Sequence, residues 1–213
     1  SPVRVISCAG REALAPDEAA SVATAVRAGG VLLFPTDTLY GLGADPLSDA
    51  GHAAICRLKG RAPGRPLPVL LADAALLGRF AAAVPAPWRS LMARFWPGPL
   101  TLLFPALPGL PRGIRSAGGK VALRVPGSAL CRSVLAAAGG ALTGTSANPS
   151  GAGGMGDPAE ALRGLGGEVD VVVNAGTLPP SPASTLLDVD GTGKMTVVRA
   201  GAVPESELGM TRS

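Results

Sequence analysis

The stretch from Gly30 to Gly43 constrains the fold most strongly, because it joins a short apolar run to a polar loop. Residues 31–34 have the apolar character of a buried strand. The chain then presents Pro35, Thr36, Asp37, Thr38 and Tyr40 before the glycines at 41 and 43, where the backbone can bend sharply or let a ligand come close. In α/β folds such loops at strand ends hold ligands, and a plain turn walled by Tyr40 is the alternative.

Apolar runs and helical patterns alternate along the rest of the chain, which is typical of an α/β protein. Strands are expected at residues 3–6, 31–34, 67–71, 100–104, 120–125, 141–145, 169–174, 184–189 and 195–199. Helices are expected at residues 16–28, 49–59, 73–82, 86–95, 128–138 and 157–165. The last two strands flank Gly191-Thr192-Gly193 and predict a hairpin, so the sheet should be mixed rather than purely parallel. We expect one α/β domain over residues 1–213, with a twisted mixed β-sheet flanked by helices.

Several classes of protein are excluded by what the chain lacks. No run of 18 apolar residues is present, so no membrane span is expected. The three cysteines, Cys8, Cys56 and Cys131, are far apart, which argues for a reducing compartment and against a disulfide framework. The single histidine, His52, lies in a helical pattern and cannot form a histidine metal site. Ser1–Arg4 is unlike a signal peptide and lacks Met, so we expect a cytoplasmic protein with a tag or leader removed.

The chain is mildly basic, with a formal charge of +4 and a pI near 9.4, which suits a nucleic acid or an anionic small ligand. Three cations, Lys59, Arg61 and Arg65, fall in one loop that also contains glycines and prolines. A stiff loop of cations can hold a polyphosphate, although a solvated surface loop is the more common meaning of such a run. Neither the P-loop spacing nor the dinucleotide fingerprint is present.

Two later segments carry further candidate groups. Arg124 lies in the apolar run Val121–Val125, where it either faces solvent or pairs with an anion, because an unpaired buried charge is costly. Thr145, Ser146 and Asn148 follow another strand, and their short polar side chains suit a ribose, a phosphate, an amino acid or a simple turn.

Taken in order, these segments resemble the YrdC/Sua5 family of threonylcarbamoyl-AMP synthases. The matching pieces cover roughly residues 15–203, which we take as the core of the domain. They are Pro35-Thr36-Asp37-Thr38-Leu39-Tyr40-Gly41-Leu42, Lys59-Gly60-Arg61 with Pro66-Leu67, Trp96-Pro97-Gly98-Pro99-Leu100-Thr101, Arg124-Val125-Pro126, Thr145-Ser146-Ala147-Asn148 with Ser150-Gly151, and Ser184-Thr185 with Asp188. Each motif is weak alone, but six in the right order are specific.

The resemblance implies a YrdC-like fold of the short, single-domain form. It implies a nucleotidyltransferase that joins L-threonine, bicarbonate (or CO2) and ATP into threonylcarbamoyl-adenylate and pyrophosphate, for the threonylcarbamoyl modification of adenosine 37 in tRNA. No side-chain nucleophile is required, and catalysis would rest on positioning and charge neutralisation. Mg2+ is expected on the phosphates with few protein ligands, and no metal-binding residues are assigned.

The resemblance also implies roles for individual residues. ATP is placed against Lys59, Arg61, Arg65, Lys120, Asn148 and Arg199. Lys59 and Arg61 are the expected catalytic residues, because they would neutralise the triphosphate and the leaving pyrophosphate. Threonine is placed against Thr38, Tyr40, Leu70, Arg124, Ser146 and Ser184, with Arg124 on its carboxylate and Tyr40 as a wall. Leu70 stands where many members carry His, so it would act through its backbone. The segment Gly153-Gly154-Met155-Gly156 lacks the Pro and Ser/Thr of many relatives.

Two other functions remain open at this point. Related domains make carbamoyl-adenylate from carbamoyl phosphate and ATP, although usually within larger chains. An RNA-binding module without catalysis is the second alternative, but only 3% of the residues are aromatic, which leaves few platforms for base stacking. The expected partners are the three substrates and a downstream tRNA-modifying transferase complex, with weak RNA binding left open and no membrane contact.

Overall fold

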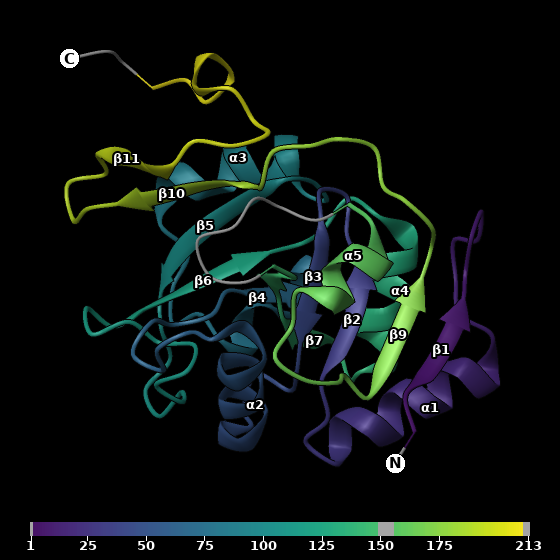
Figure 1. Ribbon diagram of the computed structural model, residues 1–213. Coiled ribbons are helices and arrows are strands. Elements are labelled where there is room, and N and C mark those ends of the chain that lie inside the picture. The colour runs from purple at the N-terminus through teal and green to yellow at the C-terminus, as the bar shows by residue number, and fades with distance from the viewer. Residues whose placement is uncertain (1, 149–155, 211–213) are drawn as a thin grey trace.

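The computed structural model describes residues 2–148 and 156–210 of the chain. Their strands form two sheets, with orders β1-β9-β2-β3-β8 and β11-β10-β5-β6-β4-β7. Figure 1 shows the two sheets side by side with helices packed against them. Each sheet has parallel and antiparallel pairs, which confirms the mixed α/β class. The expected single sheet is replaced by two.

The five-stranded sheet places the polar stretch in a hairpin. Its strands are β1 (Arg4–Ser7), β2 (Leu32–Pro35), β3 (Tyr40–Gly43), β8 (Thr145–Ser146) and β9 (Val171–Asn174). Strands β1 and β2 both run parallel to β9, whereas β3 is antiparallel to β2 and to β8. Strand β3 was not expected from the sequence, because glycines at 41 and 43 suggested a loop. The hairpin turn therefore consists of residues 36–39, and Thr36 Oγ1 accepts from the Thr38 and Leu39 amides at 3.1 Å.

The six-stranded sheet carries the late hairpin at one edge. Its strands are β4 (Val69–Leu71), β5 (Leu100–Pro105), β6 (Lys120–Arg124), β7 (Ala141–Thr143), β10 (Thr185–Val189) and β11 (Met195–Arg199). The hairpin of β10 and β11 is confirmed, and β10 continues the sheet by pairing parallel to β5. Strand β4 lies between β6, to which it is parallel, and β7, to which it is antiparallel.

Helices cover both faces of the five-stranded sheet. The α-helices are α1 (Pro16–Arg27), α2 (Asp49–Lys59), α3 (Ala86–Phe95), α4 (Ala129–Ala137) and α5 (Pro158–Arg163). Alternate residues of β2 point to opposite faces: Leu32 and Phe34 pack with α1 and α4, whereas Leu33 packs with α2 and α5. Helix α3 packs on the six-stranded sheet through Trp88 and Leu91. Two short 3-10 helices complete the structure, η1 (Ala74–Arg79) and η2 (Glu205–Glu207). The α-helix expected at residues 73–82 is instead η1, capped by Asp73.

One strand expected from the sequence is divided between the two sheets at Gly144. Strand β7 ends at Thr143 in the six-stranded sheet, and β8 begins at Thr145 in the five-stranded sheet. A Cβ at Gly144 would lie 2.5 Å from Leu70 Cγ, so only glycine fits where the chain crosses. The expected strand at 141–145 is therefore wrong as a single element, because the same apolar pattern continues through a change of sheet.

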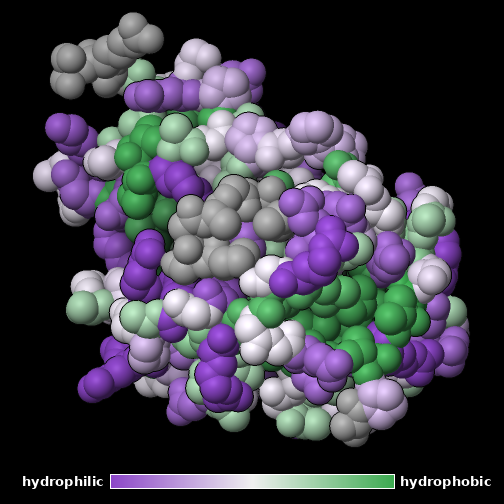
Figure 2. Space-filling model, in the orientation of Figure 1, coloured by the Kyte–Doolittle hydropathy of each residue, from purple (hydrophilic) through white to green (hydrophobic). Residues whose placement is uncertain are grey.

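Among the described residues, no helix has both the length and the apolar character needed to span a bilayer. The face in Figure 2 is largely hydrophilic, with an apolar area at lower right, where β9 and β1 lie in Figure 1.

Candidate active site

A cavity of about 430 Å³ lies between the sheets, lined by β3 and β8 on one side and by β4, β5 and β6 on the other. Every site residue that the sequence predicted lines this cavity. These residues are Thr38, Tyr40, Lys59, Arg61, Arg65, Leu70, Lys120, Arg124, Ser146, Asn148, Ser184 and Arg199. They come from segments far apart in the chain, so the fold itself brings the motifs together.

The lining is strongly positive. It includes two lysines and four arginines, and among its described residues there is no Asp or Glu. Two of the cations pair with acids that lie behind the lining: Lys120 with Asp188, and Arg124 with Asp37. The other four cations form no ion pair with a described carboxylate. This excess of positive charge suits a ligand with several negative charges.

We call residues 59–66 the cation loop. Lys59 is its first residue and the last residue of α2. Helix α2 begins at the Ser48 cap and ends at Gly60, whose φ of 62° turns the chain. Lys59 is 6% exposed, and its Nζ donates to Thr145 Oγ1 at 2.8 Å. Burial, with the nearby charges of Arg61 and Arg65, lowers the pKa of Lys59 to about 8.

Arg61 shapes the loop in which it lies. Its Nη2 donates to the carbonyls of Arg65 and Pro66, both at 3.2 Å. Its Nε is buried without a hydrogen-bond partner among the described residues. Burial, and then Arg65, lower the pKa of Arg61. The guanidinium therefore closes the loop while keeping donors for an anion.

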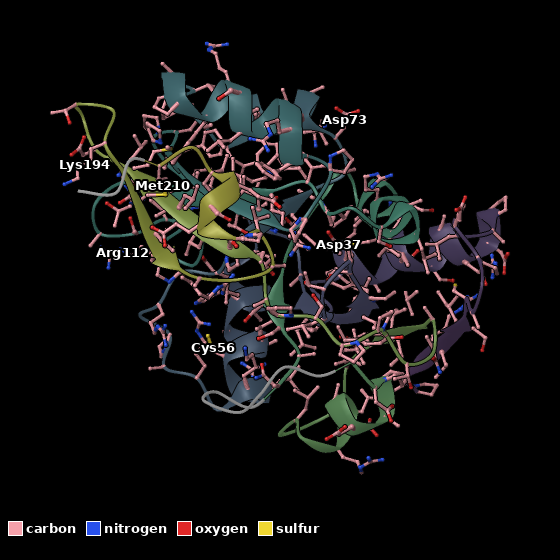
Figure 3. All side chains as sticks on the ribbon, turned by 90° about the horizontal axis from the view of Figure 1, so that it is seen from above. Asp37, Cys56, Asp73, Arg112, Lys194 and Met210 are labelled. Carbon is pink, nitrogen blue, oxygen red and sulfur yellow. The ribbon has the colours of Figure 1, made fainter. Side chains whose placement is uncertain are left out.

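His52 contacts the cation loop, although the sequence indicated only an ordinary helix residue. Its Nε2 lies 3.3 Å from the Pro63 carbonyl oxygen and 3.6 Å from Cys56 Sγ on α2, which Figure 3 labels. The ring packs against Gly113, where a Cβ would lie 2.7 Å from His52 Cγ. The Gly113 carbonyl accepts from the Leu67 amide at 2.7 Å. His52 thus lies between two loops that both line the cavity.

Arg124 is buried and paired within the chain. Its exposed fraction is 5%, its Nη2 donates to Asp37 Oδ1, and its Nε donates to the Gly98 carbonyl at 3.1 Å. Its Nη1 lies 3.5 Å from Thr38 Oγ1 at the cavity wall. The sequence left Arg124 either facing solvent or paired with an anion, and the structure pairs it with Asp37 behind the lining. The pair fixes the guanidinium and leaves Nη1 toward the cavity.

Ser184 and Arg199 join at the opposite wall. Arg199 donates through Nε and Nη2 to the Ser184 carbonyl at 3.0 and 2.8 Å, and through Nη2 to Ser184 Oγ at 2.9 Å. The Ser184 hydroxyl also contacts Thr101 Oγ1 at 2.7 Å. Burial, and then Arg124, lower the pKa of Arg199. Arg199 on β11 therefore fixes the hydroxyl of Ser184, the residue directly before β10.

Three predicted residues line the cavity with part of their side chain already engaged. Lys120 Nζ bonds Asp188 and the Val189 carbonyl, the latter at 3.0 Å. The Tyr40 hydroxyl donates to the Gly176 carbonyl at 2.7 Å and accepts from the Ala175 amide at 3.0 Å, so its ring is left as a wall. Leu70 contributes its side chain to the lining from β4, and the backbone role expected for it stays a prediction.

Some lining residues escaped sequence reasoning. Ser146 Oγ donates to Asn148 Oδ1 at 2.7 Å. The residues not assigned a role beforehand include the hydroxyls of Thr36, Thr101, Ser116 and Thr145. Thr36 and Thr145 lay within recognised motifs, whereas Ser116 carried no local signal. The motif residues Ser150-Gly151 and the Gly153–Met155 segment lie outside the described residues.

The described residues contain no cluster of three or more His, Cys, Asp or Glu side chains that could hold a metal ion.

The chain is similar to several known proteins. A family model for the Sua5, YciO and YrdC proteins, described as telomere recombination, matches residues 24–201. A Thiobacillus denitrificans protein named threonylcarbamoyl-AMP synthase is 39% identical over 175 residues, which are 80% of this chain and 89% of that protein. A protein of the same name from Halorhodospira halophila is 36% identical over 151 residues, which are 71% of this chain and 79% of that protein.

A solved structure shows the same fold. Pyrococcus abyssi Sua5, complexed with L-threonine, matches with a TM-score of 0.88 at 28% identity. The match covers 96% of this chain and 59% of the Pyrococcus chain, so this chain spans about 59% of that protein's length.

Proposed function

The chain belongs to the Sua5/YciO/YrdC family, and we propose that it is a threonylcarbamoyl-AMP synthase. It would convert L-threonine, bicarbonate (or CO2) and ATP into threonylcarbamoyl-adenylate and pyrophosphate. The observation that carries this proposal is one cavity lined by four cations that have no acid partner among the described residues and by the fixed guanidinium of Arg124. Such a cavity suits a polyphosphate and a carboxylate together.

The triphosphate would bind at the cation loop. Lys59 and Arg61 would contact the phosphate oxygens, and Arg65 lies in the same loop. Their charge would stabilise the pyrophosphate as it leaves, which is where negative charge develops. Asn148 and Arg199 would fix the rest of the nucleotide. Lys120 would act mainly by its position, because its ammonium is paired with Asp188.

L-Threonine would bind where Arg124 and Thr38 meet. The Arg124 Nη1 that faces Thr38 would pair with the amino acid carboxylate. Ser146 and Ser184 would offer hydroxyls, and the rings and chains of Tyr40 and Leu70 would form the apolar wall. The Pyrococcus relative was solved with this amino acid, which supports the assignment.

The chemistry needs no side-chain nucleophile. The threonine amine attacks CO2 and loses a proton, which gives a carbamate. A carbamate oxygen then attacks the α-phosphorus of ATP, and the bond to the β-phosphate oxygen breaks to release pyrophosphate. The protein would hold the two reactants close and neutralise charge, which can lower a barrier substantially without covalent catalysis.

We propose that Mg2+ enters with the nucleotide. Among the described residues, the lining offers hydroxyls but no carboxylate. The phosphate oxygens would supply the ligands, as is usual for Mg2+ bound with nucleotides. No step is assigned to the ion.

The product is a reactive mixed anhydride, so a second protein must consume it. That partner would be a tRNA-modifying transferase, and weak contact of this basic chain with RNA belongs to the same proposal. A cytoplasmic location would place the protein with its substrates and with tRNA.

The decisive test is pyrophosphate release from ATP by the purified protein with Mg2+ and bicarbonate, with and without L-threonine. We expect release that depends on threonine. Lys59→Ala and Arg124→Ala should lower kcat/KM by about 10- to 100-fold, the equivalent of one lost charge-assisted contact. The matched control is Lys194→Ala, which should leave the rate unchanged. Lys194 is exposed at the turn between β10 and β11 and is not one of the residues that line the cavity.

Other results would redirect the assignment. Release with carbamoyl phosphate in place of threonine and bicarbonate would place the chain with the carbamoyl-transfer proteins. Absence of release under both conditions, with RNA bound by the folded protein, would favour the RNA-binding module.

A further inference from the structure

The lysines of this chain are few and differ sharply in their surroundings. There are three, at positions 59, 120 and 194. Lys120 is paired with Asp188, and Lys194 is exposed on the turn between β10 and β11. Lys59 is buried and forms no ion pair with a described acid. Its amine is therefore the one lysine amine placed for chemistry inside the cavity.

Arg61 and Arg65 disfavour the charged form of Lys59, whereas Cys56 favours it with the smallest effect of the three. Arg61 and Arg65 approach from the loop, and Thr145 Oγ1 lies 2.8 Å away on β8. Cys56, one turn earlier on α2, is the remaining titratable group that acts on it. Since the Lys59 pKa is about 8, about half of its amines are neutral at pH 8, against roughly one in three hundred for a lysine of pKa 10.5.

We propose that Lys59 reacts reversibly with CO2 and forms a carbamate on Nζ. The Nζ lone pair attacks the CO2 carbon, a C–N bond forms, and the electron pair of one C=O bond moves to oxygen. One proton leaves Nζ for solvent. Nothing is oxidised or reduced, and the reaction reverses when the carbamate is protonated on nitrogen.

The cavity favours the product of this reaction. An ammonium beside Arg61 and Arg65 is repelled by them, whereas a carbamate anion at the same place is attracted. The Thr145 hydroxyl, which now accepts from Nζ, can turn and donate to a carbamate oxygen. A carbamate on Lys120 would instead place an anion against Asp188. The geometry thus selects Lys59 among the three lysines.

The carbamate would compete with a phosphate ligand. It replaces a positive charge with a negative charge at the end of the cation loop, so a polyanion and CO2 cannot both use Lys59. At half occupancy by CO2, the apparent Kd of a competing polyphosphate should rise about twofold. The carbamate itself does not depend on the proposed synthase reaction, and only its effect on turnover does.

The test is ¹³C NMR of the intact protein with ¹³C-bicarbonate at pH 8. We expect a lysine carbamate resonance that is lost in Lys59→Arg and retained in Lys120→Arg and Lys194→Arg. Pyrophosphate, which should fill the cation loop, should remove the signal from the wild-type protein. A resonance that persists in a folded Lys59→Arg variant, or the absence of any lysine carbamate in wild type, would overturn the proposal.

A second measurement uses wild-type protein alone and so does not depend on a variant that folds. A trialkyloxonium ion converts carbamates into stable esters, after which trypsin should fail to cut at Lys59. Mass spectrometry should then find the peptide from Leu58 to Arg61 with an added alkoxycarbonyl group. Label confined to Lys194 or the terminal amine would count against the proposal. Loss of threonine-dependent turnover, with the carbamate retained, would refute the proposed function and leave this inference standing.

Discussion

Replacement of Gly144 by alanine tests how the chain passes from one sheet to the other. The backbone φ of Gly144 lies outside the positive range, so alanine meets no conformational strain there. Its methyl group would lie 2.5 Å from Leu70 Cγ and 2.6 Å from Leu70 Cδ1, well inside contact distance. Leu70 is 3% exposed on β4, which lies between β6 and β7, and it also lines the cavity.

The expected cost follows from this overlap. Forcing a methyl group into a packed site typically destabilises a protein by about 1–3 kcal/mol. For a chain of this size each kcal/mol corresponds to roughly 2–4 °C in Tm, so the variant should melt about 2–12 °C lower. The displaced Leu70 should also narrow the cavity and raise the KM for threonine.

Urea denaturation and thermal melts would measure the change, with Gly78→Ala as the matched control. A Cβ at Gly78 meets nothing within 4 Å, so this substitution should be neutral or slightly stabilising. Leu70→Ala removes the atoms that clash, and the double variant should be more stable than the sum of the single changes predicts by about 1–2 kcal/mol. Additive effects, or a Gly144→Ala variant as stable as wild type, would refute the steric argument.

Three further outcomes are expected. Asp37→Ala should destabilise the fold by about 3–5 kcal/mol in urea melts, because it leaves Arg124 buried without its acid. Asp37→Asn should lose less stability, and an Asp37→Ala variant as stable as wild type would contradict this. His52→Ala should weaken ATP binding severalfold in calorimetry and leave threonine binding unchanged, because the ring supports the cation loop at Pro63. An equal loss of affinity for ATP and for threonine would indicate general damage to the site. Lys59→Met should have a higher Tm than wild type near pH 7, because the pKa of Lys59 is lower in the folded protein than in the unfolded chain. The wild type gains stability as pH rises from 8 to 10.5, so the advantage of Lys59→Met should disappear over that range in melts at a series of pH values.

Local signals predicted the helices of this fold well. Helix α2 coincides with the helix expected at residues 49–59, and α1 begins at Pro16 as expected. Local signals in the sequence failed where contacts between distant parts of the chain determine the structure. Residues 141–145 look like one strand, and only the approach of Leu70 to Gly144 reveals the change of sheet.

The candidate site was predicted as a set of motifs, but not as an arrangement. The resemblance of the motifs identified twelve of the residues that line the cavity. Pairings across the chain were not visible, because Asp37 and Arg124 are 87 positions apart. The same holds for the support of the cation loop by His52, since nothing near it in sequence indicates contact with Gly113.

The hairpin of β10 and β11 has a consequence for the newly made protein. Ser184 and Arg199 form one wall of the cavity, and β10 joins the sheet by a parallel pairing with β5, which is a non-local contact. At a synthesis rate of roughly 5–20 residues per second, Arg199 is added about 7–28 s after Lys59. During that interval the nascent chain carries the cation loop without its opposing wall, so its basic residues are open to any polyanion near the ribosome until the last strands pair.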